Sequence, residues 1–243
     1  MFKRTNRLAA GLVATAAASV TVLSMTAAGA SAGPPWTTFT PGGGPDANFV
    51  GSYDDPRTPS TAIVPGIRFT DIDAGQSLDC SAFSVGGSLV SPGTSRAYGA
   101  NAGNLGSLSA TGCTNPLAGA TTVDPIGTWG VTITGDATAG EFPAKLTSVK
   151  AKLTAANCVF YVEGVVNGKF NPSNQVFTPA GNPVAANATS TTPVGLKVAS
   201  TPAPPTGPMC TTLDILAGDD ISITGKFTNV PPTGSTAITI TNP

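Results

Sequence analysis

The sequence predicts an all-β protein: an antiparallel β-sandwich, immunoglobulin-like or related, held by two disulfides. Short segments alternate apolar and polar residues, and Gly, Pro and Asn separate these segments. No long segment of the mature chain repeats with the 3.6-residue period of a helix. Four cysteines, an even number, follow a segment typical of an export signal, which favours disulfides in an oxidising compartment.

Residues 1–32 are predicted to be a signal peptide. Three basic residues lie among the first seven, residues 8–25 form an uncharged run, and Ala30-Ser31-Ala32 offers the small residues that a signal peptidase accepts. Cleavage near Ala32 predicts a secreted, extracellular protein. A retained membrane anchor is the alternative, but Thr, Ser and Gly dilute the run. No second long apolar run follows, so no integral membrane segment is expected in the mature chain.

The charge of the mature chain disfavours two classes of partner. Removing three of the 12 basic residues leaves 9 against 13 acidic residues, a net charge of −4. Such a chain has no electrostatic reason to bind nucleic acid or an anionic membrane. Thr, Ser and Gly fill the surface of a chain in which only 10% of residues are charged, which suits an exported β protein.

Turn-forming residues dominate the start of the mature chain. Residues 33–65 contain Pro34-Pro35 and the run from Pro41 to Pro45, and are predicted to form an extended N-terminal arm. The β-sandwich domain is expected to occupy residues 66–243.

Eight strands are predicted within that domain. They are residues 67–72, 78–90, 129–134, 146–154, 157–166, 194–198, 221–227 and 237–240, with a bulge at Gly86-Gly87. In residues 146–154, Val149, Ala151 and Leu153 share one face, and Lys150 and Lys152 share the other. This pattern predicts an antiparallel strand with one buried and one solvent-facing side.

The four cysteines are Cys80, Cys113, Cys158 and Cys210, and they allow three pairings. Cys80 and Cys158 are each followed by an aromatic residue at the third position and glycine at the sixth, while Cys113 and Cys210 are each followed by threonine. These similarities reflect either an internal duplication or the common composition of β-turns. A duplication favours the pairs Cys80–Cys113 and Cys158–Cys210.

The sequence offers no assembled catalytic or metal site. Histidine, the commonest general base and metal ligand, is absent, and no CxxC pair occurs. No catalytic residue, no metal site and no cofactor is therefore predicted. A glycosidase would need two carboxylates flanking a sugar, and no pattern pairs Glu141 with Glu163, the two glutamates of the chain.

Paired aspartates are the remaining candidates for chemistry. Asp71 and Asp73 are spaced to share one face of a strand, while Asp219-Asp220 and Asp54-Asp55 adjoin turn-forming residues. Such pairs can bind Ca²⁺. Aspartate is also favoured in turns and at strand ends, and we favour this second interpretation.

Aromatic residues could form a platform for a sugar or an apolar molecule. Those in predicted strands are expected in the core: Phe83, Trp129, Phe160, Tyr161 and Phe227. Trp36 and Tyr53 lie in the predicted arm, where exposure is expected.

The chain resembles known proteins in four motifs. They are Leu78-Asp79-Cys80, GCTNP at residues 112–116, NCVFYVEG at 157–164 and LAGDDISITGKF at 216–227. With its Ala-rich signal peptide, the chain resembles a group of small secreted actinobacterial proteins of undefined function. It resembles more distantly the secreted proteins labelled activators of alkane oxidation. The resemblance covers most of residues 67–241 and implies a secreted β fold, and its motifs carry no catalytic positions.

We therefore expect a secreted, non-catalytic structural or binding protein of the cell surface or extracellular space. The first alternative is a module that binds an apolar or sugar molecule, and the second is a carboxylate-dependent hydrolase. The expected partner is a ligand of the cell envelope or the extracellular space, and its identity stays open at this point.

Overall fold

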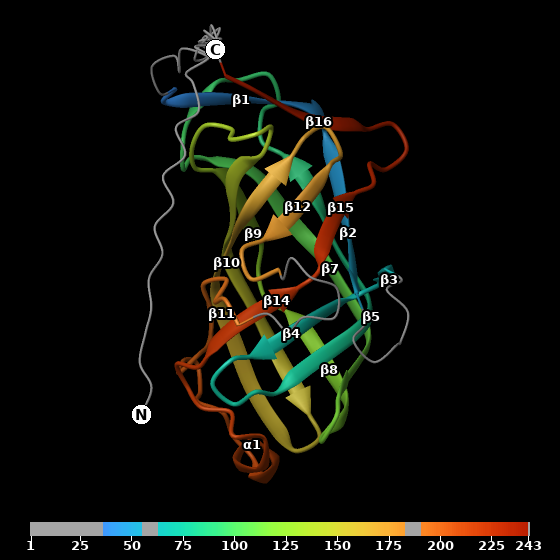
Figure 1. Ribbon diagram of the computed structural model, residues 1–243, viewed down its shortest axis with the longest axis vertical. Coiled ribbons are helices and arrows are strands. Elements are labelled where there is room, and N and C mark those ends of the chain that lie inside the picture. The colour runs from blue at the N-terminus through green and yellow to red at the C-terminus, as the bar shows by residue number, and fades with distance from the viewer. Residues whose placement is uncertain (1–35, 55–62, 183–190, 243) are drawn as a thin grey trace, which may run out of the picture. The chain divides into compact units, whose positions relative to one another are not determined.

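The computed structural model describes residues 36–54, 63–182 and 191–242, which belong to one compact unit (Figure 1). These residues form an antiparallel all-β fold with two disulfides, Cys80–Cys113 and Cys158–Cys210, which confirms the predicted fold class and pairing. The predicted signal peptide lies outside the described residues. No helix of the described residues is long and apolar enough to cross a membrane.

Strands make up nearly all of the regular structure. In chain order the strands are β1 (Thr38–Gly44), β2 (Asp46–Asp54), β3 (Ile63–Pro65), β4 (Ile67–Asp71), β5 (Ser77–Leu89), β6 (Arg96–Ala97), β7 (Asn101–Asn115), β8 (Gly119–Pro125), β9 (Trp129–Ile133), β10 (Phe142–Ala155), β11 (Cys158–Asn171), β12 (Val176–Pro179), β13 (Leu196–Val198), β14 (Asp220–Thr224), β15 (Lys226–Asn229) and β16 (Thr236–Thr241). A short helix, α1 (Pro208–Leu213), precedes β14.

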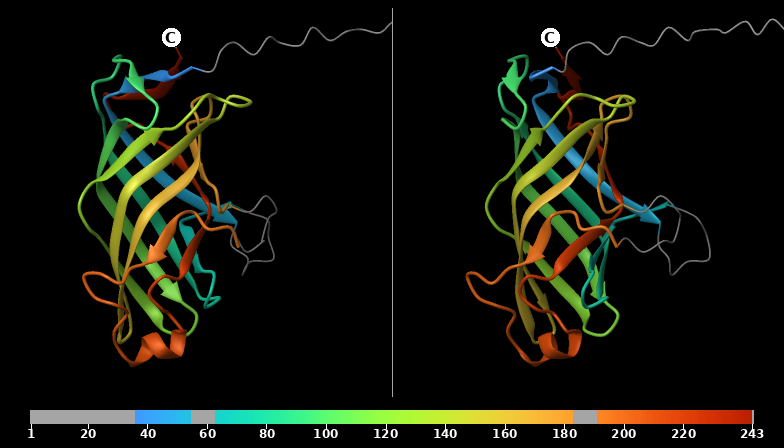
Figure 2. Two further views of the ribbon diagram at one scale, coloured as in Figure 1. Left: turned by 90° about the vertical axis from the view of Figure 1, so that its left-hand side faces the viewer. Right: turned by 60° about the vertical axis from the view of Figure 1, so that its left-hand side comes forward.

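Four long strands, β5, β7, β10 and β11, form the frame of the fold, and shorter strands join them at two levels (Figures 1 and 2). At the upper level in Figure 1, β9 joins β7 to β10, and β12, β15 and β2 join β11 back to β5. At the lower level, β8 joins β7 to β10, and β13, β14 and β4 join β11 back to β5. Within the described residues each level is therefore a closed ring of eight strands. Opposite walls face each other across a common interior, in a sandwich-like arrangement whose sides are joined by strand pairing.

The neighbouring strands β10 and β11 show how the sequence builds these walls. Ala151 pairs with Val162, and Leu153 pairs with Phe160, all with side chains on the inner face. Lys150 and Lys152 alternate with them and point outward, as predicted. On β5 the predicted bulge is confirmed, because the register with β7 shifts between Gly86 and Gly87.

Residues 38–54 correct the expectation of an N-terminal arm that ends at residue 65. They form β1 and β2, and β2 pairs with both β5 and β15, so no domain boundary separates this segment from the sheet. The turn-forming residues just before Asp46 lie at the bend between β1 and β2 and do not form an arm. Gly43 has a φ of 77° there, and a Cβ atom on it would lie 1.9 Å from the carbonyl oxygen of Ala237. Trp36 is 48% exposed, as expected, but Tyr53 lies on β2 and is only 4% exposed.

The hypothesis of two equivalent halves fits only part of the structure. Cys80 and Cys158 both lie near the start of a long strand. Their partners differ, because Cys113 lies in strand β7 and Cys210 lies in helix α1. The pairing that the duplication favoured is correct, although the two disulfides hold different kinds of element.

Both ends of the closed sheet are covered. The upper cap, which we define as the three-stranded sheet β16-β1-β6, contributes Phe39, Pro41, Ile238 and Ile240 to the interior. The lower cap, defined as residues 208–216 with helix α1, contributes Leu213 and Ile215. The interior is therefore bounded by the rings at its sides and by a cap at each end.

Candidate functional site

The interior of the closed sheet contains a cavity of about 160 Å³. Nearly all of the side chains around it are apolar, and they come from both caps and from the strands of both rings. A ring of about eight strands is the size at which side chains either fill the interior or leave room for one small ligand. A volume this small, bordered by residues from both caps, is a narrow space along the axis of the rings.

Small residues on the inner face of β10 account for the unfilled space. Ala144, Ala151 and Ala155 occupy inward positions where larger apolar residues would reach further into the interior. The sequence alternation predicted an inward apolar face here, but only the closure of the rings shows that its small residues face a cavity.

Aromatic rings form much of the remaining wall. Phe83 contacts Phe69 and Phe227 edge to face, with ring centroids 5.7 and 5.6 Å apart. Phe227 in turn lies 6.1 Å from Phe177. Of the aromatic residues predicted in the core, Phe83, Trp129, Phe160 and Phe227 line the cavity, whereas Tyr161 lies between inward neighbours on β11 and is half-buried on the outer side.

Polar groups gather at the end of the cavity nearest the lower cap. Asp71 at the end of β4 lines the cavity there, together with Gln76, Ser77, Asn115 and Thr121. The Asn115 side chain is held at both ends, since its amide nitrogen donates to the carbonyl of Ser77 and its oxygen accepts from two backbone N–H groups. This end of the cavity therefore holds most of the polar lining residues, while the other lining residues are apolar apart from Ser88 and the indole N–H of Trp129.

One oxygen of the Asp71 carboxyl has no partner. Oδ1 accepts hydrogen bonds from the backbone N–H groups of Asp73 (3.1 Å) and Ala74 (3.0 Å), and closes the turn between β4 and β5. Oδ2 is buried without any hydrogen bond, and the residue is 7% exposed. Burial, opposed in part by the Ala74 hydrogen bond, raises the pKa of Asp71 to about 6, and the negative charges of Asp219 and Asp73 add to the rise.

The structure brings together two of the aspartate pairs that the sequence singled out. Asp73 Oδ2 accepts a hydrogen bond from the backbone N–H of Asp220 (2.8 Å), and Asp219 Oδ2 accepts one from Leu216 (2.6 Å). The Asp219 carboxylate therefore closes a local turn, the interpretation favoured from sequence, whereas that of Asp73 joins the β4–β5 turn to the first residue of β14. In the described part of the chain, no group of three or more acidic or cysteine side chains is arranged to hold a metal ion. Asp55, of the third pair, lies outside the described residues.

The two glutamates are separated from the cavity. Glu163 pairs with Lys150 at 2.8 Å on the outer faces of β11 and β10, and Glu141 lies 3.5 Å from Lys169. Neither glutamate lines the cavity, and among the described acidic residues Asp71 alone does. The two-carboxylate geometry of a glycosidase is not present at this cavity.

Trp129 carries a second buried polar atom without a partner. The residue lies at the start of β9, opposite Leu105 of β7, and is 7% exposed. Trp129 lines the cavity, and its indole Nε1–H is buried without a hydrogen bond. Buried indole N–H groups usually have a partner, so this donor is an unsatisfied polar atom within the lining of the cavity.

The upper cap is attached by hydrogen bonds. The Gln175 side chain donates to the carbonyl of Ile238 and accepts from its N–H, both at 2.8 Å, and so imitates a strand neighbour of β16. Tyr98 donates from its hydroxyl to Asp136 (2.5 Å), while Asn242 donates to both of these residues. Burial and the Asp136 carboxylate raise the pKa of Tyr98 to about 12, so the hydroxyl keeps its proton as a donor.

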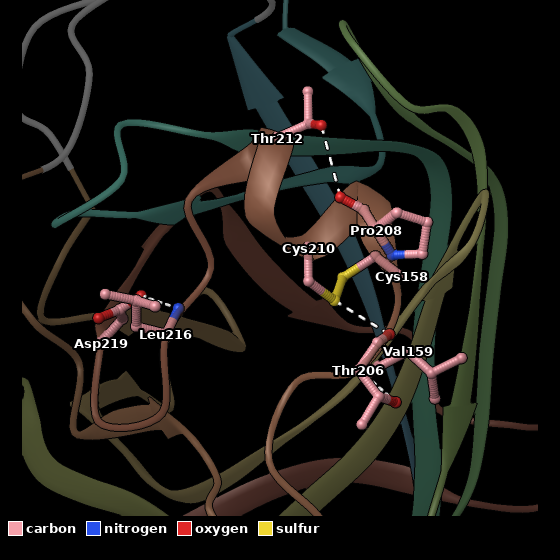
Figure 3. The surroundings of a disulfide bond; sticks show 8 residues. All are labelled: Cys158, Val159, Thr206, Pro208, Cys210, Thr212, Leu216 and Asp219. Carbon is pink, nitrogen blue, oxygen red and sulfur yellow. Dashed lines mark hydrogen bonds between the residues drawn. A yellow bond between two sulfur atoms is a disulfide. The ribbon is translucent and has the colours of Figure 1, made fainter.

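The lower cap is attached by a covalent bond. Figure 3 shows the Cys158–Cys210 disulfide, which joins the first residue of β11 to helix α1. Beside it, Val159 and Thr206 exchange backbone hydrogen bonds of 2.9 Å. The Cys80–Cys113 disulfide, in contrast, joins residues that already face each other on β5 and β7.

No protein-family model matches this chain, and searches of the curated proteins and of the solved structures gave no match. The functional argument therefore depends on the cavity and its lining residues.

Proposed function

We propose that this protein is an extracellular, non-catalytic binding protein that holds a small apolar molecule inside its closed sheet. The observation that carries the proposal is the largely hydrocarbon-lined cavity of about 160 Å³ in the interior of the rings. A cavity of comparable size in an engineered protein stays dry and binds benzene. The two disulfides support the extracellular part of the proposal, because such bonds persist in oxidising compartments.

An empty cavity of this size is energetically unfavourable. At about 24 cal/mol per Å³, about 160 Å³ of unfilled space corresponds to about 4 kcal/mol of lost packing energy. Typical domains are stable by only about 5–15 kcal/mol. A ligand that fills the space would recover part of this energy, and would stabilise the folded protein by an amount that grows with the logarithm of its free concentration above its Kd.

The lining favours an apolar chain over a sugar. A sugar carries hydroxyl groups along its whole length, and each needs a hydrogen-bond partner when it is buried. The cavity provides polar side chains mainly at its lower end, near Asp71, and hydrocarbon elsewhere. A thin, unbranched apolar molecule meets both the chemistry of the wall and the narrowness of the space.

Trp129 allows a direct test of occupancy. The chain contains two tryptophans, so replacing the exposed Trp36 by phenylalanine leaves Trp129 at the cavity wall as the reporter. A brominated n-alkane, which quenches indole fluorescence on contact, should quench Trp129 saturably, whereas aqueous iodide should not.

A matched pair of variants places the ligand. Ala151→Leu adds three carbons to the wall of the cavity and should weaken quenching by the bromoalkane, whereas Ala82→Leu makes the same change at an exposed position of β5 and should not. Unsaturable quenching, or equal quenching in both variants, would show that the interior is a packed core, and would favour a structural role.

A further inference from the structure

We propose that the bound molecule is an apolar chain that ends in a primary ammonium group, and that this group lies against the Asp71 carboxylate at the lower end of the cavity. The inference rests on the proposed function and specifies its ligand. It starts from Asp71, a lining residue of the cavity whose oxygen Oδ2 is buried without a hydrogen bond.

A buried carboxylate oxygen without a partner destabilises a fold. Leaving such a group unsatisfied typically costs about 1–3 kcal/mol, and more when the group is charged. The turn between β4 and β5 uses only Oδ1, which an asparagine at this position would supply equally well. The second oxygen therefore has no structural task in the turn, and in the proposed complex the carboxylate of this lining residue meets the ligand.

The charges around Asp71 favour a cation. Asp73 from the β4–β5 turn and Asp219 from the loop before β14 both act on Asp71 as like charges. On the neighbouring strands, Asp220 is paired with Lys197 at 2.8 Å, and Arg68 is paired with Asp79 across β4 and β5. Both of these basic residues already have acidic partners, so the lower end carries an excess of negative charge. A ligand carboxylate would be repelled there, whereas an ammonium would be attracted.

The distribution of polarity fixes the direction of the ligand. Gln76 and Ser77 line the cavity beside Asp71 and add polar atoms at the same end. Towards the upper cap the wall consists of aromatic and aliphatic side chains, such as Phe49, Phe170 and Ile240. A molecule with one polar end and an apolar chain therefore fits with its head at the lower cap and its chain directed towards the upper cap.

The test compares four ligands of equal chain length by calorimetric titration: a 1-aminoalkane, a 1-alkanol, an n-alkanoate and an n-alkane. Because a charge-assisted hydrogen bond is stronger than a neutral one, the amine should bind about tenfold more tightly than the alkanol. The alkanoate should bind most weakly. Asp71→Asn should reduce the affinity for the amine to that for the alkanol, while Asp124→Asn removes an exposed carboxylate of β8 and should leave the preference intact.

A second measurement needs no variant. Amine affinity of the unaltered protein should fall as the pH drops through about 6, because protonation of Asp71 removes the charge that holds the ammonium. Equal affinities for amine, alkanol and alkane would overturn this inference and leave the proposed function intact. Loss of binding for all four ligands, together with absent bromoalkane quenching, would instead overturn the proposed function.

Discussion

Replacing Asp71 by asparagine should stabilise the ligand-free protein at neutral pH. The carboxyl has an ordinary pKa of 3.8, which burial raises to about 6 in the folded protein. Because the folded pKa is the higher one, the folded state binds the proton more tightly than the unfolded state. This group therefore favours folding at low pH, and its contribution is lost as the pH rises from about 4 to about 6.

The size of the effect follows from the difference between the two pKa values. A rise of 6 − 3.8 = 2.2 corresponds to about 3 kcal/mol at neutral pH, at about 1.36 kcal/mol per unit. Asparagine avoids the buried charge and keeps an acceptor for the Asp73 and Ala74 N–H groups. Asp71→Asn should therefore raise the free energy of unfolding at about pH 7.5 by up to about 3 kcal/mol, and the gain should shrink towards zero near pH 3.5.

Urea unfolding of both proteins across this pH range measures the effect, and the difference between them removes the titration of all other groups. Asp124→Asn, at an exposed position of β8, should show no comparable gain. If Asp71→Asn were neutral or destabilising at neutral pH, or if its effect did not depend on pH, then Oδ2 would have a partner and the lower end of the cavity would not be dry.

Three further predictions concern the caps and the cavity. Replacing both Cys158 and Cys210 by alanine should lower the free energy of unfolding by about 4 kcal/mol, because the disulfide closes a loop with a sequence separation of 52 residues. The change should also release α1, which proteolysis would detect. Unchanged proteolysis of α1 would contradict this role. Ala151→Leu should raise the melting temperature of the ligand-free protein by a few degrees, because it adds about three buried carbons at about 0.8 kcal/mol each. A marked destabilisation would show that the space is already filled. Gln175→Ala removes the bonds to Ile238 and should speed amide hydrogen exchange in β16 without altering exchange in β11; uniform exchange would show that the upper cap is not a separate unit.

The strands with bulky alternating residues could be predicted from sequence, because alternation of bulky apolar and polar residues is compatible only with a strand that has one buried face. β10 and β11 are examples, with inward Leu153 and Phe160. β7 was missed, because its Asn, Gly and Ser residues are typical of loops. Neighbours on both sides satisfy its backbone groups, and this tertiary effect outweighs its low strand propensity.

The candidate site was predictable only in its parts. The sequence identified Asp71 and Asp73 as a pair on one strand segment, and it placed Trp129 in a strand. The pair divides instead, because Asp71 lies at the cavity wall, whereas the Asp73 carboxylate accepts the backbone N–H of Asp220. No local pattern reports that two levels of strands close into rings, since this closure depends on pairings such as β2 with β5 and β4 with β14. The cavity exists only after those long-range pairings are made.

Closure of both rings also bears on self-association. A strand at the edge of a sheet presents unpaired N–H and C=O groups on which another chain can add, and β-rich proteins must guard such edges. In the described residues every strand of the two rings has a neighbour on each side. The strands with one free side are β3, only three residues long and ending in Pro65, and β6 and β16 of the upper cap. The described residues, whose regular structure is nearly all strand, thus present little template for intermolecular pairing.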